Sequence, residues 1–152
     1  MSELLDLSVR NPQIVEELVK GLQAVDRDKS IRLGLARGGR YFVKGGTRRL
    51  KERMRSGAGG VSGNLLRSFT IRLKRSTPGV LAGFKRGAKA GAHSHLVDLG
   101  TSSRKRKNGG STGVMPANYF WHDTRQKDEA GALEEVKKGL ELFVVRLKNK
   151  VG

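Results

Sequence analysis

The sequence predicts an α+β fold, in which a small antiparallel β-sheet is packed by a long N-terminal helical region and a C-terminal helix. Two observations predict this class: apolar residues recur at helical spacing near both ends of the chain, and two short segments between them follow the pattern of strands. An order of helices, then strands, then a helix is typical of α+β proteins. The 152 residues suit a single domain.

Residues 1–27 are predicted to form an N-terminal helical arm that serves as a docking segment outside the main domain. Asn11-Pro12 marks a helix start, because proline is favoured at the first helical position. An apolar face at helical spacing then runs from Ile14 to Leu22. The main α+β domain is expected to cover residues 28–152.

The next helix is predicted to begin at a cap, either Asp28 or Ser30, and to run to about Arg55. Five glycines lie inside it, and each costs about 1 kcal/mol relative to alanine. They are Gly34, Gly38, Gly39, Gly45 and Gly46. The helix is therefore either broken near residues 38–46 or stabilised there by close packing against a neighbour, and the sequence leaves both alternatives open.

The middle of the chain predicts a hairpin followed by a long loop. A glycine-rich turn over 56–63 precedes alternating apolar and polar residues at 69–74, and a turn leads to a second strand at 80–84. Residues 95–99 are expected to form a strand or a helical turn. Residues 100–114 have no apolar periodicity and predict a long exposed loop.

A helical pattern returns from about Asn118 and continues to the end of the chain. An apolar stripe runs from Leu133 to Leu147, which predicts a helix with one buried face. Acidic residues occur early in this segment and basic residues late, an order that suits the helix macrodipole.

The charge of the chain is strongly basic and unevenly distributed. The formal net charge is +17, and residues 31–107 contain 20 Lys or Arg against 2 Asp or Glu. Such an excess favours an anionic partner, either nucleic acid, an acidic protein face or a membrane surface. No membrane-spanning segment is expected, because charged residues interrupt every apolar stretch. Aromatic residues make up only 5% of the chain, which argues against a binder that stacks bases.

No catalytic, metal or cofactor site is expected from the sequence. The chain has no cysteine, and Gly63 is followed by Asn64-Leu65 where a phosphate-binding loop needs Lys and Ser or Thr. His93 and His95 would share one face of a strand, but Asp98 would then lie on the other face. We therefore expect a protein that is not an enzyme.

Three stretches, in order along the chain, resemble one family. They are Ser62-Gly63-Asn64-Leu65-Leu66-Arg67-Ser68, Ala92 to Thr101 with Asp98-Leu99-Gly100-Thr101 at its end, and Met115-Pro116-Ala117-Asn118-Tyr119-Phe120. Together they are similar to the turn, the acid-x-Gly-Thr segment and the Pro-Ala-Arg-Pro-Phe segment of the neck or tail-completion proteins of tailed phages. These are the gene-10-like tail components of Hong-Kong-type lambdoid phages. The resemblance spans roughly residues 28–150, and this chain departs from the pattern at Asn118 and Tyr119.

The resemblance implies an α+β structural protein of the virion, assembled in the bacterial host cytoplasm. Its copies would form a ring, for which six is the natural number, between the head-closure (stopper) protein and the tail terminator or tail-tube protein. Whether the subunit completes the tail or is the tail terminator itself stays open. The motif positions that the resemblance marks as structural are Ser62, Gly63, Asn64, Leu65, Ser68, His95, Asp98, Gly100, Thr101, Pro116 and Phe120.

Charge and resemblance together predict that a basic surface faces genome DNA in the lumen of the ring or an acidic neighbouring ring. The candidates are Arg72, Lys74 and Arg75 on the hairpin, and Arg104, Lys105, Arg106 and Lys107 in the loop. The alternative function is that of a basic, nucleic-acid-binding architectural protein.

Overall fold

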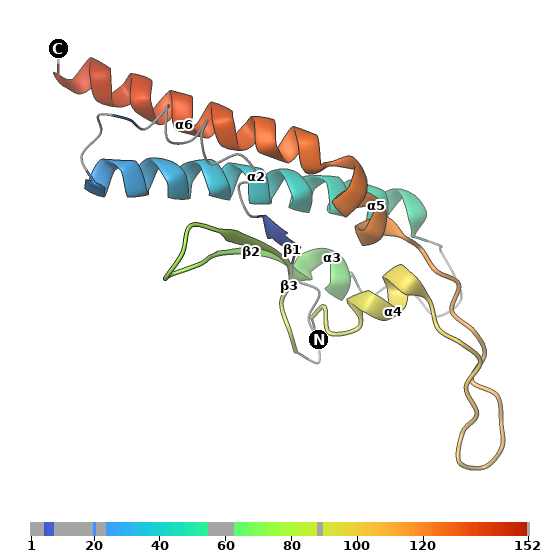
Figure 1. Ribbon diagram of the computed structural model, residues 1–152. Helices are drawn as coiled ribbons and strands as arrows, with labels where there is room; N and C mark the ends of the chain where they lie inside the picture. The colour runs from blue at the N-terminus through green and yellow to red at the C-terminus, as the bar shows by residue number, and fades with distance from the viewer. Residues whose placement is uncertain (1–4, 8–19, 21–23, 55–62, 88–89, 152) are drawn as a thin grey trace.

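Helix α2 (Ala24–Arg53) forms the middle layer of the protein, with helix α6 (Glu129–Val151) on one side and a β-sheet on the other (Figure 1). The structure is a computed structural model, and it describes residues 5–7, 20, 24–54, 63–87 and 90–151. The arrangement confirms the predicted α+β class, with a long N-terminal helix, an antiparallel sheet and a C-terminal helix.

In the part of the chain that the structure describes, the sheet has three strands in the order β1-β3-β2, all antiparallel. Strands β2 (Phe69–Leu73) and β3 (Val80–Phe84) form the predicted hairpin, with Phe69 opposite Phe84. Strand β1 (Leu5–Leu7) pairs with the other edge of β3, so residues 5–7 belong to the sheet and not to a helix. The rest of the predicted arm lies outside the described residues, except Lys20 and the residues that open α2.

Helix α2 is unbroken, because its glycines allow close packing. A methyl group at Gly34 would lie 2.8 Å from the carbonyl oxygen of Val136 in α6, and one at Gly38 would lie 2.6 Å from the side chain of Val136. On the face toward the aromatic core, a methyl group at Gly46 would lie 2.9 Å from the Trp121 ring. Of the two alternatives that the sequence leaves open, close packing is therefore the correct one.

The predicted start of this helix is wrong, since α2 begins at Ala24 and includes both proposed caps. The hydroxyl of Ser30 is buried and donates to the carbonyl oxygen of Arg27, 2.7 Å away, within the helix. Apolar residues of α2 then enter the core at helical spacing. The core combines them with residues of the sheet and of the C-terminal helices: Leu35, Phe42, Leu50, Leu65, Val80, Ala82, Phe120, Trp121 and Ala132.

Outside these layers, the described residues contain three short helices. Helix α3 (Asn64–Ser68) lies directly before β2, where only a turn was expected. Helix α4 (Ser94–Leu99) shows that residues 95–99 are helical and not a strand. The C-terminal helical region is divided at Asp128 into α5 (Phe120–Lys127) and α6.

Among the described residues, three ion pairs join α2 to α5, to α6 and to Asp128 between them. They are Arg37–Glu135, Arg49–Asp128 and Arg53–Asp123. The Arg49 pair is buried and bidentate, with Nη1 and Nη2 donating to the two carboxylate oxygens at 2.6 and 2.8 Å. These hydrogen bonds raise the pKa of Arg49 above its ordinary value. The hydrogen bond from Arg53 lowers the pKa of Asp123. Both shifts favour the charged form, so Arg49 and Asp123 are charged at neutral pH.

Candidate functional site

The three motif stretches converge at one end of the molecule, near the C-terminal end of α2. The first stretch forms α3, the second forms α4, and the third leads into α5. Backbone hydrogen bonds join the last two stretches: the Asn118 amide donates to the carbonyl oxygen of Val97 at 3.0 Å, and the Tyr119 amide donates to that of Asp98 at 2.8 Å. Residues that are far apart in sequence therefore build one structural unit.

The carboxylate of Asp98 holds the start of α5. It is 2% exposed, and its oxygens accept hydrogen bonds from the backbone amides of Trp121 at 2.7 Å and His122 at 3.1 and 3.2 Å. The first amides of a helix have no partner within the helix, and a negative charge at this end is favourable. Asp98 is thus a positioning residue that fixes α5 relative to α4.

Gly100 and Thr101 form the base of an arm. Gly100 has φ of 76°, and a methyl group there would lie 2.7 Å from the carbonyl oxygen of Met115. Only glycine adopts such a conformation readily. The Thr101 amide donates to Met115 O at 2.9 Å, and the Met115 amide donates to Thr101 Oγ1 at 3.0 Å. These bonds join the two ends of the segment that runs between them.

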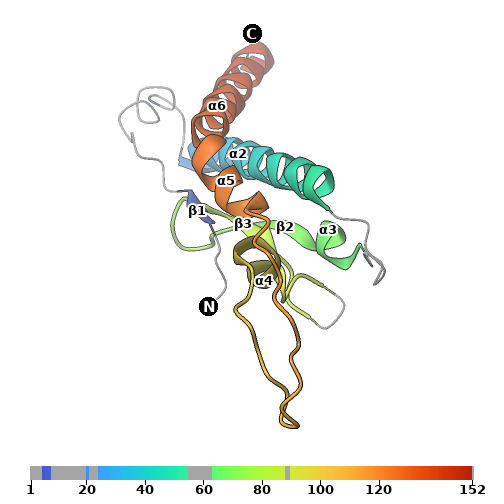
Figure 2. The same cartoon turned by 90° about the vertical axis from the view of Figure 1, so that its right-hand side faces the viewer.

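This segment, residues 101–115, projects from the body as a narrow arm (Figures 1 and 2). Its two halves bond to each other: the Thr112 amide donates to the carbonyl oxygen of Arg104 at 2.8 Å, and the Arg106 amide donates to that of Gly110 at 2.7 Å. The predicted loop is therefore a hairpin-like arm. The basic run of residues 104–107 is exposed in its outer part.

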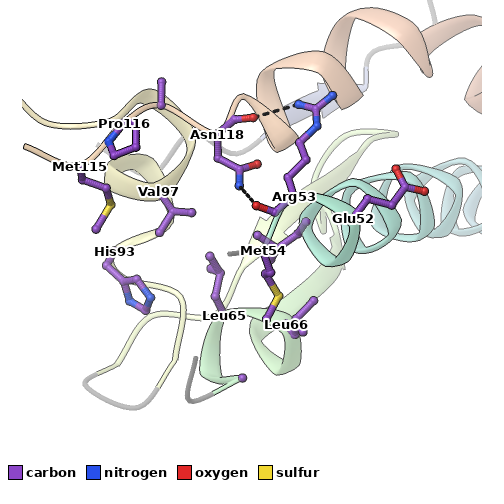
Figure 3. A pocket seen from close by; sticks show the side chains of 13 residues that line it. Glu52, Arg53, Met54, Leu65, Leu66, His93, Val97, Met115, Pro116 and Asn118 are labelled. Carbon is purple, nitrogen blue, oxygen red and sulfur yellow. Dashed lines mark hydrogen bonds between the residues drawn. The ribbon is translucent and has the colours of Figure 1, made fainter. Parts of the chain in front are cut away.

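An apolar groove lies between the C-terminal end of α2 and the base of the arm (Figure 3). Its volume is about 690 Å³. Around it lie Met54, which follows α2, Leu65 and Leu66 of α3, Val97 of α4 and Met115 of the arm. Glu52 and His93 lie at its margin. The lining residues are Leu50, Glu52, Arg53, Met54, Gly63, Leu65, Leu66, His93, Val97, Met115, Pro116, Ala117 and Asn118.

Arg53 and Asn118 close one side of the groove by bonding to each other's backbone. Arg53 Nη1 donates to Asn118 O at 3.0 Å, and Asn118 Nδ2 donates to Arg53 O at 3.2 Å. The next residue, Tyr119, has φ of 56°. Proline, which the family pattern carries at this position, cannot adopt a positive φ. The departure at Tyr119 therefore goes with a local backbone different from the one that the family pattern implies.

Most of the other residues that the family resemblance marks contribute to the fold. Gly63 has φ of 70° and precedes α3, and the buried Ser68 hydroxyl donates to Leu65 O at 2.7 Å. Phe120 is fully buried in a group of four aromatic rings with Phe69, Phe84 and Trp121. His95 and Pro116 are exposed, and Ser62 lies outside the described residues.

The predicted basic candidates do not form one surface. Arg72 is exposed on strand β2, and Arg75 is exposed in the turn between β2 and β3. Lys74 is only partly exposed, because its side chain lies against Gly79. Figure 1 places this turn and the tip of the arm at opposite ends of the molecule.

A further basic surface was missed in the sequence. Arg40, Lys44, Arg48 and Lys51 are all exposed on the outer face of α2. Their spacing of three to four residues is a helical signal that was readable beforehand.

Neither a metal site nor a membrane span is found in the described part of the chain. No group of three or more His, Asp or Glu side chains there is arranged to hold a metal ion. Within the same residues, no helix has the length and apolar character needed to cross a bilayer. His93 and His95 are exposed at the start of α4.

Comparison with known proteins gives no match: no protein-family model, no curated protein and no solved structure matches this chain.

Proposed function

We propose that this protein is a structural subunit of a homo-oligomeric ring at the head–tail neck of a tailed bacteriophage, where it completes the tail or joins it to the head. The proposal rests on the motif resemblance and on one structural observation. Two unlike apolar patches lie toward opposite ends of the molecule, and each is suited to contact a second copy of the chain.

The first patch is the apolar groove. The second, called the α6 patch, consists of Leu33, Leu142 and Val145, which are 48%, 47% and 53% exposed. Helices α2 and α6 run antiparallel (Figure 1). A methyl group at Gly34, next to Leu33, would lie 3.2 Å from the Leu140 side chain, so Leu33 lies at the same end as the C-terminal half of α6. Leu33 lies 17 residues before Leu50 in the groove, or about 25 Å along the axis of α2.

Unlike patches at opposite ends favour head-to-tail contacts, in which the groove of one subunit binds the α6 patch of the next. Such heterologous contacts produce a ring when the rotation between subunits closes. A ring of six copies is the proposed assembly. Burial of the apolar side chains on both sides supplies the driving force.

The arm extends beyond both patches and is free to contact a different protein. A neighbouring ring, either the head-closure (stopper) protein on one side or the tail terminator or tail-tube protein on the other, is the proposed partner. The bases Arg104 to Lys107 favour an acidic face on that partner or phosphates of the genome DNA in the lumen.

Head-to-tail assembly predicts that two defective subunits complement each other. Met115→Asp places a charge in the groove, and Leu142→Asp with Val145→Asp places charges on the α6 patch. Each variant alone should stay monomeric, because no copy can continue the chain of contacts. An equimolar mixture should yield dimers and no rings, since one intact groove meets one intact α6 patch. Native mass spectrometry at high protein concentration measures which oligomers are present in each variant alone and in the mixture. The unsubstituted protein is the ring-forming control.

A mixture that remains monomeric, or a dimer formed by one variant alone, would contradict head-to-tail assembly. The second result would indicate an isologous contact through a single patch.

A phage that lacks this gene is expected to produce filled heads and separate tails. Electron microscopy of lysates counts joined and unjoined particles. The unsubstituted gene supplied in trans should restore joined virions, and the Met115→Asp gene should not. A normal yield of virions without the gene would refute a function at the neck.

A further inference from the structure

We infer that the outer face of α2 binds the sugar-phosphate backbone of duplex DNA without reading its sequence. The surface, called the basic ridge, consists of Arg40, Lys44, Arg48 and Lys51. The inference does not depend on the neck assignment, because it rests on the charges of a single helix.

The ridge is a continuous row of positive charge. Its members are spaced by three or four residues and share one face of α2, over a length of about 16 Å. Arg48 approaches Glu52 at 3.9 Å, but both side chains are more than 60% exposed, so this pair neutralises little charge. Arg40, Lys44 and Lys51 form no ion pair with the described residues.

Several other bases of α2 and α6 are paired with acids within the fold. The bases that α2 directs toward α5 and α6 are paired with acids. On α6, Lys137 lies 3.0 Å from Glu134, and Lys138 lies 3.3 Å from Glu135. No such pairing balances the ridge, and its mutual repulsion would be relieved by an anionic ligand.

The composition of the ridge favours phosphates over a protein or a membrane. The centre of a protein interface is poor in charge and contains apolar or aromatic anchors. The hollow along the ridge is lined by Lys44, Thr47, Arg48, Lys51 and Glu52, none of them apolar. The nearby aromatic side chain of Tyr41 lies against Gly131 at the start of α6. Membrane association needs a continuous exposed apolar face. The core side chains of α2 are buried, and its exposed Leu33 lies about two turns before the ridge. Duplex phosphates require only cations.

The test compares two variants that remove the same number of charges. The ridge variant carries Arg40→Gln, Lys44→Gln, Arg48→Gln and Lys51→Gln, and the arm variant carries Arg104→Gln, Lys105→Gln, Arg106→Gln and Lys107→Gln. Fluorescence anisotropy with a labelled duplex of mixed sequence gives the affinity between about 50 and 200 mM salt. All eight side chains are exposed, and thermal melting by circular dichroism checks that both variants stay folded.

The ridge variant is expected to bind at least about tenfold more weakly and to reduce the slope of log K against log salt by about 3.6, or 0.9 for each lost phosphate contact. The arm variant should keep most of the affinity and of the slope. Equal losses in both variants would overturn the inference, because binding would then follow total charge. So would no binding by the unsubstituted protein, or polyglutamate competing as well as DNA, which would assign the ridge to an acidic protein.

Discussion

Substitution of Arg49 with methionine is expected to lower the free energy of unfolding by about 3–5 kcal/mol, because it leaves the buried carboxylate of Asp128 without its partner. Arg49 and Asp128 are each 8% exposed, and Arg49 also donates to the hydroxyl of Thr124 at 3.0 Å. The carboxylate also faces Gly45, so α2 approaches it closely. Urea denaturation followed by circular dichroism measures the loss.

A matched control distinguishes burial from charge pairing in general. Arg37 forms an equally short pair with Glu135, at 2.6 Å, but the Arg37 side chain is 41% exposed. Arg37→Met is therefore expected to cost less than about 1 kcal/mol. The double variant Arg49→Met with Asp128→Leu should recover much of the stability, because no buried charge remains unpaired. An Arg49 variant that loses no more than the Arg37 variant would show that burial does not make the pair between Arg49 and Asp128 important for stability.

Replacement of Asp98 with alanine is expected to cost about 2–4 kcal/mol, because the amides of Trp121 and His122 lose their acceptors in a buried place. The same change should loosen the start of α5 and, through it, the base of the arm. Hydrogen exchange measures this local effect: the amides of Trp121 and His122 should exchange faster than the global loss of stability alone predicts.

Asp98→Asn provides the control, because its amide oxygen can take the place of Oδ1, which accepts from both amides, and only the second acceptor oxygen and the charge are lost. It should cost clearly less than Asp98→Ala and keep part of the protection. If the alanine variant loses stability uniformly, with no preferential exchange at Trp121 and His122, the carboxylate does not act as the cap of α5.

Elements with a strong local pattern were predictable from the sequence. The apolar stripe from Leu133 to Leu147 lies within α6, and the alternation at 69–73 becomes β2, since both patterns record which residues face the core. The hairpin turn follows from its proline and glycine. Long segments with clear periodicity depend little on information from elsewhere in the chain.

Elements that depend on distant partners were not predictable in the same way. The continuity of α2 depends on α6, about 100 residues later, because α6 packs against its glycines. The division between α5 and α6 goes with Asp128, which is drawn to Arg49 on α2. Strand β1 has only three residues, and its pairing with β3 has no local signal.

The candidate site shows the same difference between local patterns, which the sequence predicts, and arrangements that depend on distant partners. The motif residues were recognisable, but their meeting at the groove depends on bonds such as those from Asp98 to α5. The basic run in the arm was predictable because its four residues are consecutive in the sequence. The basic ridge was visible only after residues were assigned to a helix face, because its members are separated by apolar and glycine positions.

The glycines of α2 have a consequence for the order of folding during synthesis. Five glycines lower the intrinsic stability of this helix by about 5 kcal/mol in total, so α2 forms poorly before its partner is present. Its partner α6 begins at Glu129, and the ion pair between Arg37 and Glu135 spans 98 residues. Most of the chain must therefore leave the ribosome before the central layer becomes stable. Chains interrupted before α6 should present neither a formed groove nor an ordered ridge, which keeps incomplete subunits out of an assembly.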